Sequence, residues 1–389
     1  MPSSSRRLRL CLKDLYHQDV VEMIERETRA FEMREILEPG DPDFPAAYKM
    51  LWDAFGADGE IEQRDDIERF LKEDAFEPTS NGTYIRFFLI VGRDREGNIL
   101  GVRDGSVLIN PNYDADLCVV YLAHLYMIPR ARGTVLSYEL RIAPVEIAID
   151  YLMQLHLRGL IKLPQPEQPG RNFGMHITLA AEMEYYWPSD PVSWQRILFY
   201  GRGGFDVLNP AHVPYLQPDF RDRGGVRVTG SQAIPLMVLV RRMGRERQAT
   251  MPIEEAAAIT RLLYDDFACH WKPEELESSL QRVLDGLASR AKRKDFVELL
   301  PLPTGPKDLN RIRPLYRFSA YQKYYKGSSP AVDELLNHPD RQLLRNPAYL
   351  DYELRKLAAY LESRPRYIYP SRDKGFTWEG NPDPSPDDS

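Results

Sequence analysis

Cysteine is scarce in this sequence. The 389 residues include three cysteines, Cys11, Cys118 and Cys269. They form no CxxC pair and no Cys/His spacing typical of zinc, which argues against a disulfide framework and against structural zinc. Cys118 and Cys269 lie in apolar stretches, so we interpret them as buried structural thiols rather than catalytic ones.

Long hydrophobic runs are also lacking. No stretch approaches the roughly 20 apolar residues that a membrane-spanning helix needs. The N-terminal stretch MPSSSRRLRLCLKDLYHQD is basic at first, but it has no apolar core of signal-peptide length. We therefore expect a soluble, cytoplasmic protein with no membrane partner.

An excess of positive charge is absent as well. The formal net charge is -7, which gives no overall attraction for a nucleic acid. The stretch RIRPLYRFSAYQKYYK, residues 311–326, alternates aromatic and basic residues in the way that some nucleic-acid surfaces do. The acidic net charge and the helical surroundings favour aromatic packing with snorkelling cations instead, so we expect no nucleic-acid partner.

Several catalytic signatures do not occur. The sequence contains no GxSxG, no HExxH and no Walker loop with its lysine, and its seven histidines form no recognisable metal cluster. These absences exclude the enzyme classes that depend on such motifs, and we expect no metal cofactor.

The hydrophobic content, 43% of the residues, is enough for a sizeable core, and the length suits two domains. Residues 1–31 are predicted to form a polar, mostly helical lead-in, and residues 32–243 one α/β domain. From residue 250 the pattern becomes helical, so we expect an all-helical C-terminal domain over 250–375. The acidic tail, 376–389, is expected to be disordered.

The predicted element order within residues 32–243 is strand, two helices, three strands, helix, strand, helix and two strands. The first of the three consecutive strands is joined to the second by REGN, which indicates a hairpin. Asp43 and Pro45 are expected to start the first helix, and Gly56 to end it. The order predicts a compact α/β fold.

A strand, a tight basic turn and a helix follow one another in HLYMIPRARGTVLS, residues 124–137. Main-chain N–H groups at a helix N-terminus can hold phosphate, and the helix dipole favours negative charge there. Gly133 allows close approach, and Arg132 adds positive charge. Val135 brings a branched side chain into the turn. Pro144 is expected to kink the following helix or to delay its start.

A second motif, SWQRILFYGRGGF at residues 193–205, follows the next predicted strand. It places Tyr200 four residues before Gly204 and five before Phe205. The pattern predicts a helix that carries the tyrosine near its end and stops at the glycines.

The two motifs and the element order resemble the GCN5-related N-acetyltransferase (GNAT) superfamily, whose members move an acyl group from acyl-coenzyme A to an amine. The first motif lies over the family pattern ELxVxPxxRGxGxG, with Arg132 and Gly133 on its RG pair and Val135 in place of a glycine. The second lies over NxxAxxxYxxxGF, with Ser193 in place of the usual asparagine. The resemblance covers about residues 32–243.

This resemblance implies a mixed, mostly antiparallel sheet flanked by helices, with acetyl-CoA or another acyl-CoA as co-substrate. It implies that Tyr200 protonates the leaving thiolate, which suits a phenol with a pKa of about 10. It also implies that a main-chain N–H near Met127 holds the thioester oxygen. The expected coenzyme-binding residues are Met127, Ile128, Arg132, Gly133, Thr134, Val135, Leu136, Ser137 and Ser193.

A general base is needed because an amine at neutral pH is mostly protonated and must lose a proton before it attacks. His124 stands where the family often has a glutamate, and its ordinary pKa of about 6.5 suits the task. Glu182 and Glu184 lie two residues apart on the next predicted strand, so they share a face. All three remain candidates.

Two functions remain open. The first is a GNAT-type N-acyltransferase, most simply an acetyltransferase, acting on a small-molecule or peptide amine by direct attack. Its C-terminal domain would cover the acceptor cleft or form a homodimer. The second is a catalytically silent protein of the same fold that binds acyl-CoA or a partner, which the departures at Val135 and Ser193 favour.

Overall fold

The structure is a computed structural model, and the chain divides into two compact units. The first unit comprises Met1–Ala180 and Arg261–Cys269, and the second comprises Ala181–Thr260 and His270–Ser389. The domain boundaries expected from composition stay predictions. The described residues are 5–8, 31–56, 60–132, 134, 136–164, 175–185, 191–217, 234–246, 248–269, 271 and 273–305.

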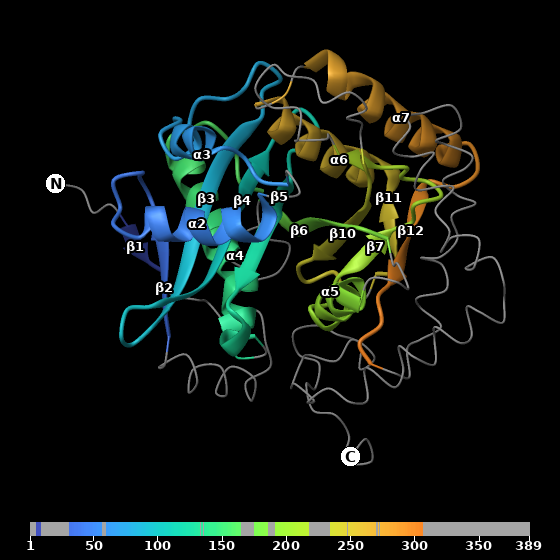
Figure 1. Ribbon diagram of the computed structural model, residues 1–389. Coiled ribbons are helices and arrows are strands. Elements are labelled where there is room, and N and C mark those ends of the chain that lie inside the picture. Colours follow the sequence, from blue (N-terminus) through green and yellow to red (C-terminus); the bar gives the residue numbers. More distant parts are fainter. Residues whose placement is uncertain are drawn as a thin grey trace. The chain divides into compact units, whose positions relative to one another are not determined.

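The first unit is built on one mixed sheet (Figure 1). Its strands lie in the order β1-β2-β3-β4-β5-β6. Neighbours are antiparallel from β1 to β5, and β5 and β6 are parallel. The mixed, mostly antiparallel sheet flanked by helices is therefore confirmed. The elements are β1 (Ser5–Arg7), β2 (Phe31–Ile36), α2 (Phe44–Phe55), α3 (Arg64–Phe70), β3 (Tyr84–Asp94), β4 (Ile99–Ile109), β5 (Leu117–Met127), α4 (Leu136–Leu157) and β6 (His176–Met183).

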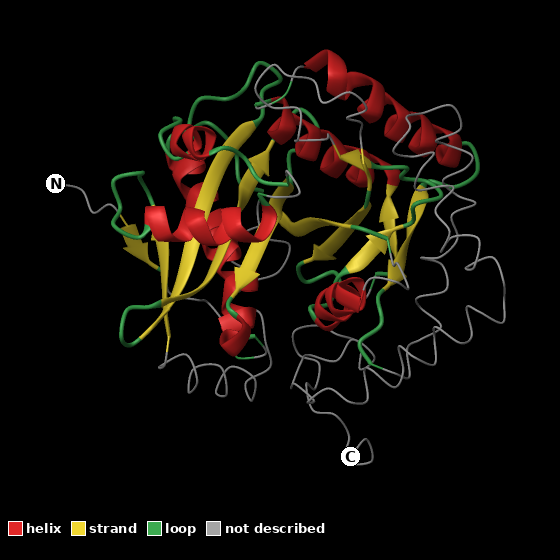
Figure 2. Cartoon of the chain, viewed as in Figure 1, coloured by secondary structure: helices red, strands yellow, loops and turns green. Residues whose placement is uncertain are grey.

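The second unit contains a smaller group of strands and further helices (Figure 2). Its sheet has the order β10-β7-β12-β11, with antiparallel neighbours, and β8 pairs with β9. The last residues of β6 and the first half of α6 also belong to this unit. The elements are α5 (Pro191–Arg202), β7 (Asp206–Leu208), β8 (Leu216–Gln217), β9 (Ile234–Pro235), β10 (Met237–Arg242), β11 (Thr250–Pro252), α6 (Ile253–Ala268), α7 (Pro273–Ala291) and β12 (Phe296–Pro301).

Local sequence signals account for most of these bounds. Helix α2 begins after Asp43 with a proline in its first turn, and it ends at Gly56, as predicted. The Asp43 carboxylate makes no side-chain hydrogen bond to the helix, because it forms ion pairs with Arg34 (3.2 Å) and Arg93. The β3–β4 hairpin turns at Gly97, where φ is 86°. These stop and turn signals act over a few residues, which is why the sequence displays them.

Helices cover both faces of the first unit's sheet. Successive strand residues point to opposite faces. Val91 packs in the core cluster with α2 and α3, whereas its neighbour Gly92 faces α4. A Cβ on Gly92 would lie 2.5 Å from Leu136 Cδ1, and one on Gly101, paired opposite, would lie 2.7 Å from Leu140 Cδ1. The two glycines thus let the start of α4 approach the sheet closely.

Pro144 does not delay the start of α4, which is one helix from Leu136 to Leu157. A proline inside a helix lacks one main-chain hydrogen bond and costs about 3 kcal/mol in an isolated helix. The residues around it, Ile142, Ala143, Val145 and Ile147, are all buried. Packing against the sheet therefore outweighs the local preference that the sequence displays.

The helical lead-in predicted over residues 1–31 is wrong for its one described stretch. Ser5–Arg7 form β1, which pairs with β2. The Arg6 guanidinium contacts Glu35 on β2 at 2.6 Å and Asp150 on α4 at 2.6 Å. Because Glu35 and Asp150 are far from Arg6 along the chain, the sequence around Arg6 does not indicate that a strand forms there. Residues 9–30 lie outside the described residues.

The all-helical C-terminal domain is also corrected for residues 250–305, which contain strands β11 and β12 besides two helices. Thr250–Pro252 pair with β12, so α6 starts only at Ile253. In β12, Val297 and Leu299 are buried and their neighbours are partly exposed, which is a period of two. Residues 306–389 lie outside the described residues.

Candidate functional site

Strand β5 contains a bulge, and β6 pairs with only the first half of β5. Against β4, the register shifts between Arg103, which faces Leu125, and Gly105, which faces Leu122. The parallel pairing with β6 covers only the first half of β5 and ends at Tyr121. Beyond that residue β5 continues to Met127, and among the described residues of the first unit no strand pairs with this second half on the β6 side, so it presents a strand edge.

The main chain at Met127 is turned toward this edge. The Ile128 N–H donates to the Leu100 carbonyl on β4 (3.0 Å). A trans peptide points its C=O opposite to its N–H, so the Met127 carbonyl faces away from β4, where Arg132 Nε donates to it (3.0 Å). In an extended strand the N–H of a residue points to the same side as its C=O. The Met127 N–H therefore points away from β4, toward this strand edge.

The turn after β5 uses several of its own N–H groups. Pro129–Ala131 form a short 3-10 turn. The Ala131 N–H donates to the Ile128 carbonyl (3.0 Å), the Arg132 N–H to the Pro129 carbonyl (3.3 Å) and the Thr134 N–H to the Ala131 carbonyl (3.4 Å). These donors hold the turn in shape and point at its own carbonyls.

The hydroxyls of the turn are engaged in the same way. Thr134 Oγ1 donates to the Ala131 carbonyl (2.7 Å), and Ser137 Oγ donates to the Thr134 carbonyl (2.8 Å). Ser137 is buried, and Leu136 is the first residue of α4. Gly133 and Val135 lie outside the described residues. The phosphate-binding site expected in this turn thus stays a prediction. The start of α4 and the nearby cations support it.

Those cations are Arg132 and Arg130. The Arg132 guanidinium lies over the Tyr126 ring, 5.9 Å from its centre. Arg130 is exposed and lies 3.8 Å from the Asp94 carboxylate. Both stand in the turn that leads into α4, whose N-terminus carries a partial positive charge. Two cations and a helix N-terminus thus follow one another along the chain here, with the acidic residue Glu139 in the first turn of α4.

His124, a predicted base, lies in the bulge of β5 with both ring nitrogens occupied. Nδ1 lies 3.0 and 3.1 Å from the two carboxylate oxygens of Asp104, and Nε2 lies 2.9 Å from the main-chain carbonyl of Glu60. The His124 N–H also donates to Asp104 Oδ1 (2.8 Å). Carboxylate and carbonyl oxygens only accept hydrogen bonds, so each ring nitrogen must carry a proton. The ring is an imidazolium in this arrangement.

Electrostatics agrees with that assignment. Burial by itself would lower the pKa of His124, but the Asp104 carboxylate, assisted by Glu62 and the Glu60 carbonyl, outweighs it and raises the pKa to about 9. A group that is already protonated and whose two N–H bonds are donated is poorly suited to accept a proton. This geometry counts against His124 as the general base.

The free energy of unfolding is expected to fall as the pH rises through about 9. The folded pKa of His124 is raised above its unfolded value of about 6.5, so its contribution is complete below pH 6.5 and is lost above the folded pKa. At about 1.4 kcal/mol per pKa unit, this contribution is on the order of 3 kcal/mol. Urea unfolding between pH 6 and pH 10 measures it. His124→Gln should flatten the curve, and parallel curves for the two proteins would contradict the assignment.

Tyr200 lies in the second unit, at the end of α5. Gly204 has φ 76°, its N–H donates to Gly201 (3.0 Å), and the Phe205 N–H donates to the Tyr200 carbonyl (3.1 Å). These two bonds make a Schellman motif, in which the residues at the positions of Tyr200 and Phe205 commonly touch. Their rings do so, with centres 5.2 Å apart. The spacing that resembles the family thus also ends the helix, and the half-buried ring of Tyr200 helps to hold that end.

The two glutamates predicted as alternative bases also lie in the second unit. Glu182 accepts a hydrogen bond from Gln217 Nε2 (2.9 Å). Glu184 directly follows β6, and it forms an ion pair with Arg196 of α5. Ser193 lies in the first turn of α5, and its side chain is outside the described residues. Both carboxylates can be identified in the sequence, whereas their partners, Gln217 and Arg196, leave no local signal there.

Comparison with known proteins gives matches at the level of structure. No protein-family model and no curated protein matches the sequence. A GCN5-related N-acetyltransferase from Kribbella flavida matches at 16% identity, covering 55% of this chain and 99% of that one, with a TM-score of 0.24. A GNAT-family acetyltransferase from Staphylococcus aureus matches at 11% identity, covering 54% and 98%, with a TM-score of 0.25.

A third match is a GNAT superfamily phosphinothricin acetyltransferase from Sinorhizobium meliloti, solved in complex with AcCoA. It is 13% identical, covers 62% of this chain and 90% of that one, and has a TM-score of 0.22. All three identities are below 25%, and all three TM-scores are below 0.5. From β2 to β6 the chain's own elements follow the expected order, with parallel β6 after an antiparallel series. The fold is GNAT-like.

The cysteines of this GNAT-like chain are poor nucleophiles where they are described. Burial raises the pKa of the Cys118 thiol well above its ordinary value. For the half-buried Cys269, burial together with Asp266 raises the pKa to about 12. A thiol with a raised pKa is protonated at neutral pH and reacts slowly. Both fit the structural role expected of them.

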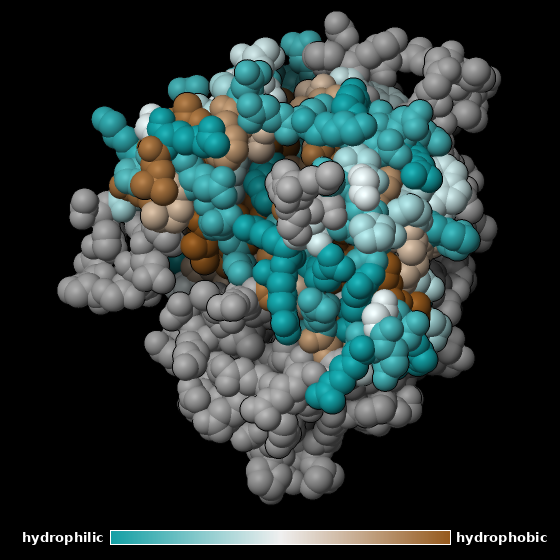
Figure 3. All heavy atoms as spheres, turned by 90° about the vertical axis from the view of Figure 1, so that its left-hand side faces the viewer, coloured by the Kyte–Doolittle hydropathy of each residue, from teal (hydrophilic) through white to brown (hydrophobic). Residues whose placement is uncertain are grey.

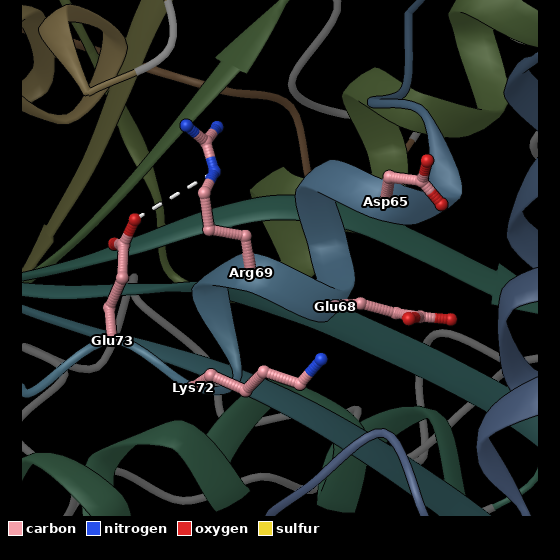
Figure 4. A pocket seen from close by; sticks show the side chains of 5 residues that line it. All are labelled: Asp65, Glu68, Arg69, Lys72 and Glu73. Atoms are coloured by element: carbon pink, nitrogen blue, oxygen red, sulfur yellow. Dashed lines mark ion pairs between the residues drawn. The ribbon is translucent and has the colours of Figure 1, made fainter.

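A surface pocket of about 480 Å³ lies at α3 and is charged throughout (Figure 4). Arg69 and Glu73 point toward one another across it, with 3.9 Å between their nearest charged atoms. None of the predicted site residues lines it. The lining residues are Asp65, Glu68, Arg69, Lys72 and Glu73.

The described surface offers neither a metal site nor a membrane span. Within the described ranges, no group of three or more His, Cys, Asp or Glu side chains could hold a metal ion. In the same ranges no helix is both long and apolar enough to cross a bilayer. On the face drawn in Figure 3, hydrophobic residues form separate groups among hydrophilic ones. The large exposed hydrophobic side chains in the described part are Trp52, Leu157 and Leu160.

Proposed function

We propose that this chain is an N-acyltransferase of the GNAT type that moves an acyl group, most simply acetyl, from acyl-coenzyme A to an amine. The observation that carries the proposal is the second half of β5. Its edge continues past the pairing with β6, and the Met127 N–H is directed toward it. The same strand then leads through a cationic turn into the N-terminus of α4.

This arrangement suits a long ligand that has a thioester at one end and a diphosphate nearer the other. A strand edge offers N–H donors to an extended ligand as it would to another strand. Arg130 and Arg132 provide cations for the diphosphate beside the start of α4. The Met127 N–H would donate to the thioester oxygen as negative charge develops on it.

The chemical step needs no covalent intermediate on the protein. The amine nitrogen attacks the thioester carbonyl carbon, the new C–N bond forms, and the C–S bond breaks. Before the attack, the base takes one proton from the substrate ammonium, which gives the neutral amine. The leaving thiolate takes the phenol proton of Tyr200, and the second proton that the nitrogen loses restores the phenol. Glu182 and Glu184 remain the candidates for that base, because His124 is already protonated. Glu182 accepts a hydrogen bond from Gln217, and Glu184 forms an ion pair with Arg196.

The alternative is a protein that binds acyl-CoA or a partner without turnover. One observation favours it, namely the turn before α4, where the Thr134 and Ser137 hydroxyls and several N–H groups are used internally. The acceptor in the first case is a small-molecule or peptide amine. A homodimer and a cytoplasmic location also remain proposals.

Titration with acetyl-CoA and a thiol-release assay with a panel of amines separate the two functions. The enzyme is expected to release one thiol per amine acylated. Arg132→Gln should weaken acetyl-CoA binding about tenfold, because a charge-assisted contact is lost. Arg158→Gln removes an equal charge that lies over the Phe76 ring, and it should leave binding unchanged. Binding without thiol release supports the alternative, and no binding contradicts the enzyme and any role in binding acyl-CoA.

A further inference from the structure

The imidazolium of His124 joins three segments that are far apart in the sequence. It lies on β5, its Nδ1 donates to Asp104 on β4, and its Nε2 donates to the carbonyl of Glu60 in the connection between α2 and α3. The ring of Phe55, at the end of α2, packs against it with 5.0 Å between the ring centres. The imidazole therefore lies where the end of α2 and the start of that connection meet the sheet.

The bulge in β5 is what makes this geometry available. Asp104 stands at the register shift, and its carboxylate is buried. Oδ1 accepts both the His124 main-chain N–H (2.8 Å) and the ring N–H (3.0 Å). One carboxylate thus fixes the bulged main chain and also orients the ring, which leaves Nε2 directed at Glu60.

We propose that the His124 imidazolium, bound to Asp104 and to the Glu60 carbonyl, holds the α2–α3 connection against the bulge of β5, and that His124 is a positioning residue rather than the base. We call this arrangement the imidazolium bridge. It lies on the strand whose far edge we assign to the acyl donor, so its effect on catalysis rests on the proposed function. Its effect on the connection does not.

The charged groups that face the ring explain why it stays protonated. Asp104 contributes a carboxylate from β4, and Glu62 contributes a second negative charge from the connection. Phe55 contributes an uncharged ring from α2. Loss of a ring proton removes one of the two ring donors, so the hydrogen bond to Asp104 or the one to the Glu60 carbonyl is lost. The bridge is therefore expected to open as the ring deprotonates.

Nuclear magnetic resonance of the wild-type protein tests the protonation state directly. With 15N-labelled histidine, both ring nitrogens of His124 should be protonated at pH 7.5, and the ring should titrate near pH 9. His156, whose ring lies 3.4 Å from the Ile161 carbonyl, serves as the internal reference. A neutral His124 ring at pH 7.5 would overturn the proposal, and this result does not depend on whether the protein is an enzyme.

Hydrogen exchange of the peptide covering residues 56–63 tests the positioning role. His124→Gln should raise its exchange rate about tenfold, because a hydrogen bond from a charged donor is lost, while peptides of α4 stay unchanged. The wild type should show the same rise above pH 9 after correction for intrinsic exchange. His156→Gln is the matched control. Unchanged protection of this peptide in His124→Gln would overturn the proposal.

If the protein proves active, the kinetic constants distinguish positioning from base catalysis. If His124 is a positioning residue, His124→Gln should raise KM for the amine several-fold and change kcat little. A base predicts loss of kcat with KM preserved, which would count against the imidazolium bridge as the role of His124. Failure of activity in all variants, with the exchange result intact, would refute the proposed function and leave the bridge standing.

Discussion

Tyr200→Phe is expected to lower kcat by a factor of about 10² to 10⁴ and to leave the fold intact. The phenol is the proposed proton donor to the leaving thiolate, and a positioned general acid contributes about this much. Phenylalanine keeps the ring that packs on Phe199 and Phe205, with centres 5.3 and 5.2 Å away. It also keeps the main-chain carbonyl that accepts from the Phe205 N–H. Thiol release at saturating acetyl-CoA measures the effect.

The structural role of Tyr200 supplies the control. Tyr200→Ala removes the hydroxyl and also the ring contact at the end of α5, so it should lower the free energy of unfolding, by about 2 kcal/mol or more for a half-buried aromatic ring. Tyr200→Phe keeps the ring contact and should lower the free energy of unfolding by much less. If Tyr200→Phe retains full kcat, the tyrosine only ends the helix and the mechanism proposed above is wrong.

Gly105→Ala is expected to destabilise the protein by at least about 3 kcal/mol. Gly105 has φ 154°, and a Cβ there would lie 2.0 Å from the Tyr121 main-chain oxygen and 2.8 Å from Phe88 Cζ. The oxygen belongs to the neighbouring strand, so it cannot move without breaking the β4–β5 pairing. Overpacking and an unfavourable φ each cost about 1 to 3 kcal/mol. Urea unfolding measures the loss.

Gly97→Ala is the matched control for this substitution. Gly97 also has a positive φ, 86°, but nothing lies within 4 Å of the position that its Cβ would take. Alanine should cost about 1 to 2 kcal/mol there, from the backbone conformation alone. Equal losses at the two glycines would show that the close approach to Tyr121 does not constrain the sheet.

These two predictions illustrate which parts of the site sequence reasoning could reach. The Tyr200–Gly204–Phe205 spacing is local, because a helix end is built from residues within six positions of one another. It was therefore visible in the sequence, together with the helix that it ends. The sequence gives no sign that Gly105 is required, because what excludes a side chain at this position is the main-chain oxygen of Tyr121 on the next strand.

The role of His124, in contrast, could not be predicted from the sequence. The sequence placed it on the right strand, but the ring's partners lie 20 and 64 residues away, at Asp104 and Glu60. An ordinary pKa suggested a base, whereas a buried carboxylate and a carbonyl make the ring a cation. The protonation state of a histidine depends on its neighbours in space, and the sequence of one strand does not show which residues these are.

The sequence by itself determined the order of the helices and strands from β2 to α5, because the signals involved act over a few residues. Only the tertiary structure decided that Ser5–Arg7 join the sheet, that β11 and β12 interrupt a helical region, and that the edge of β5 continues past β6. Each of these depends on main-chain pairing between distant segments, where the hydrogen-bonding partner, and not the residue's own preference, sets the outcome.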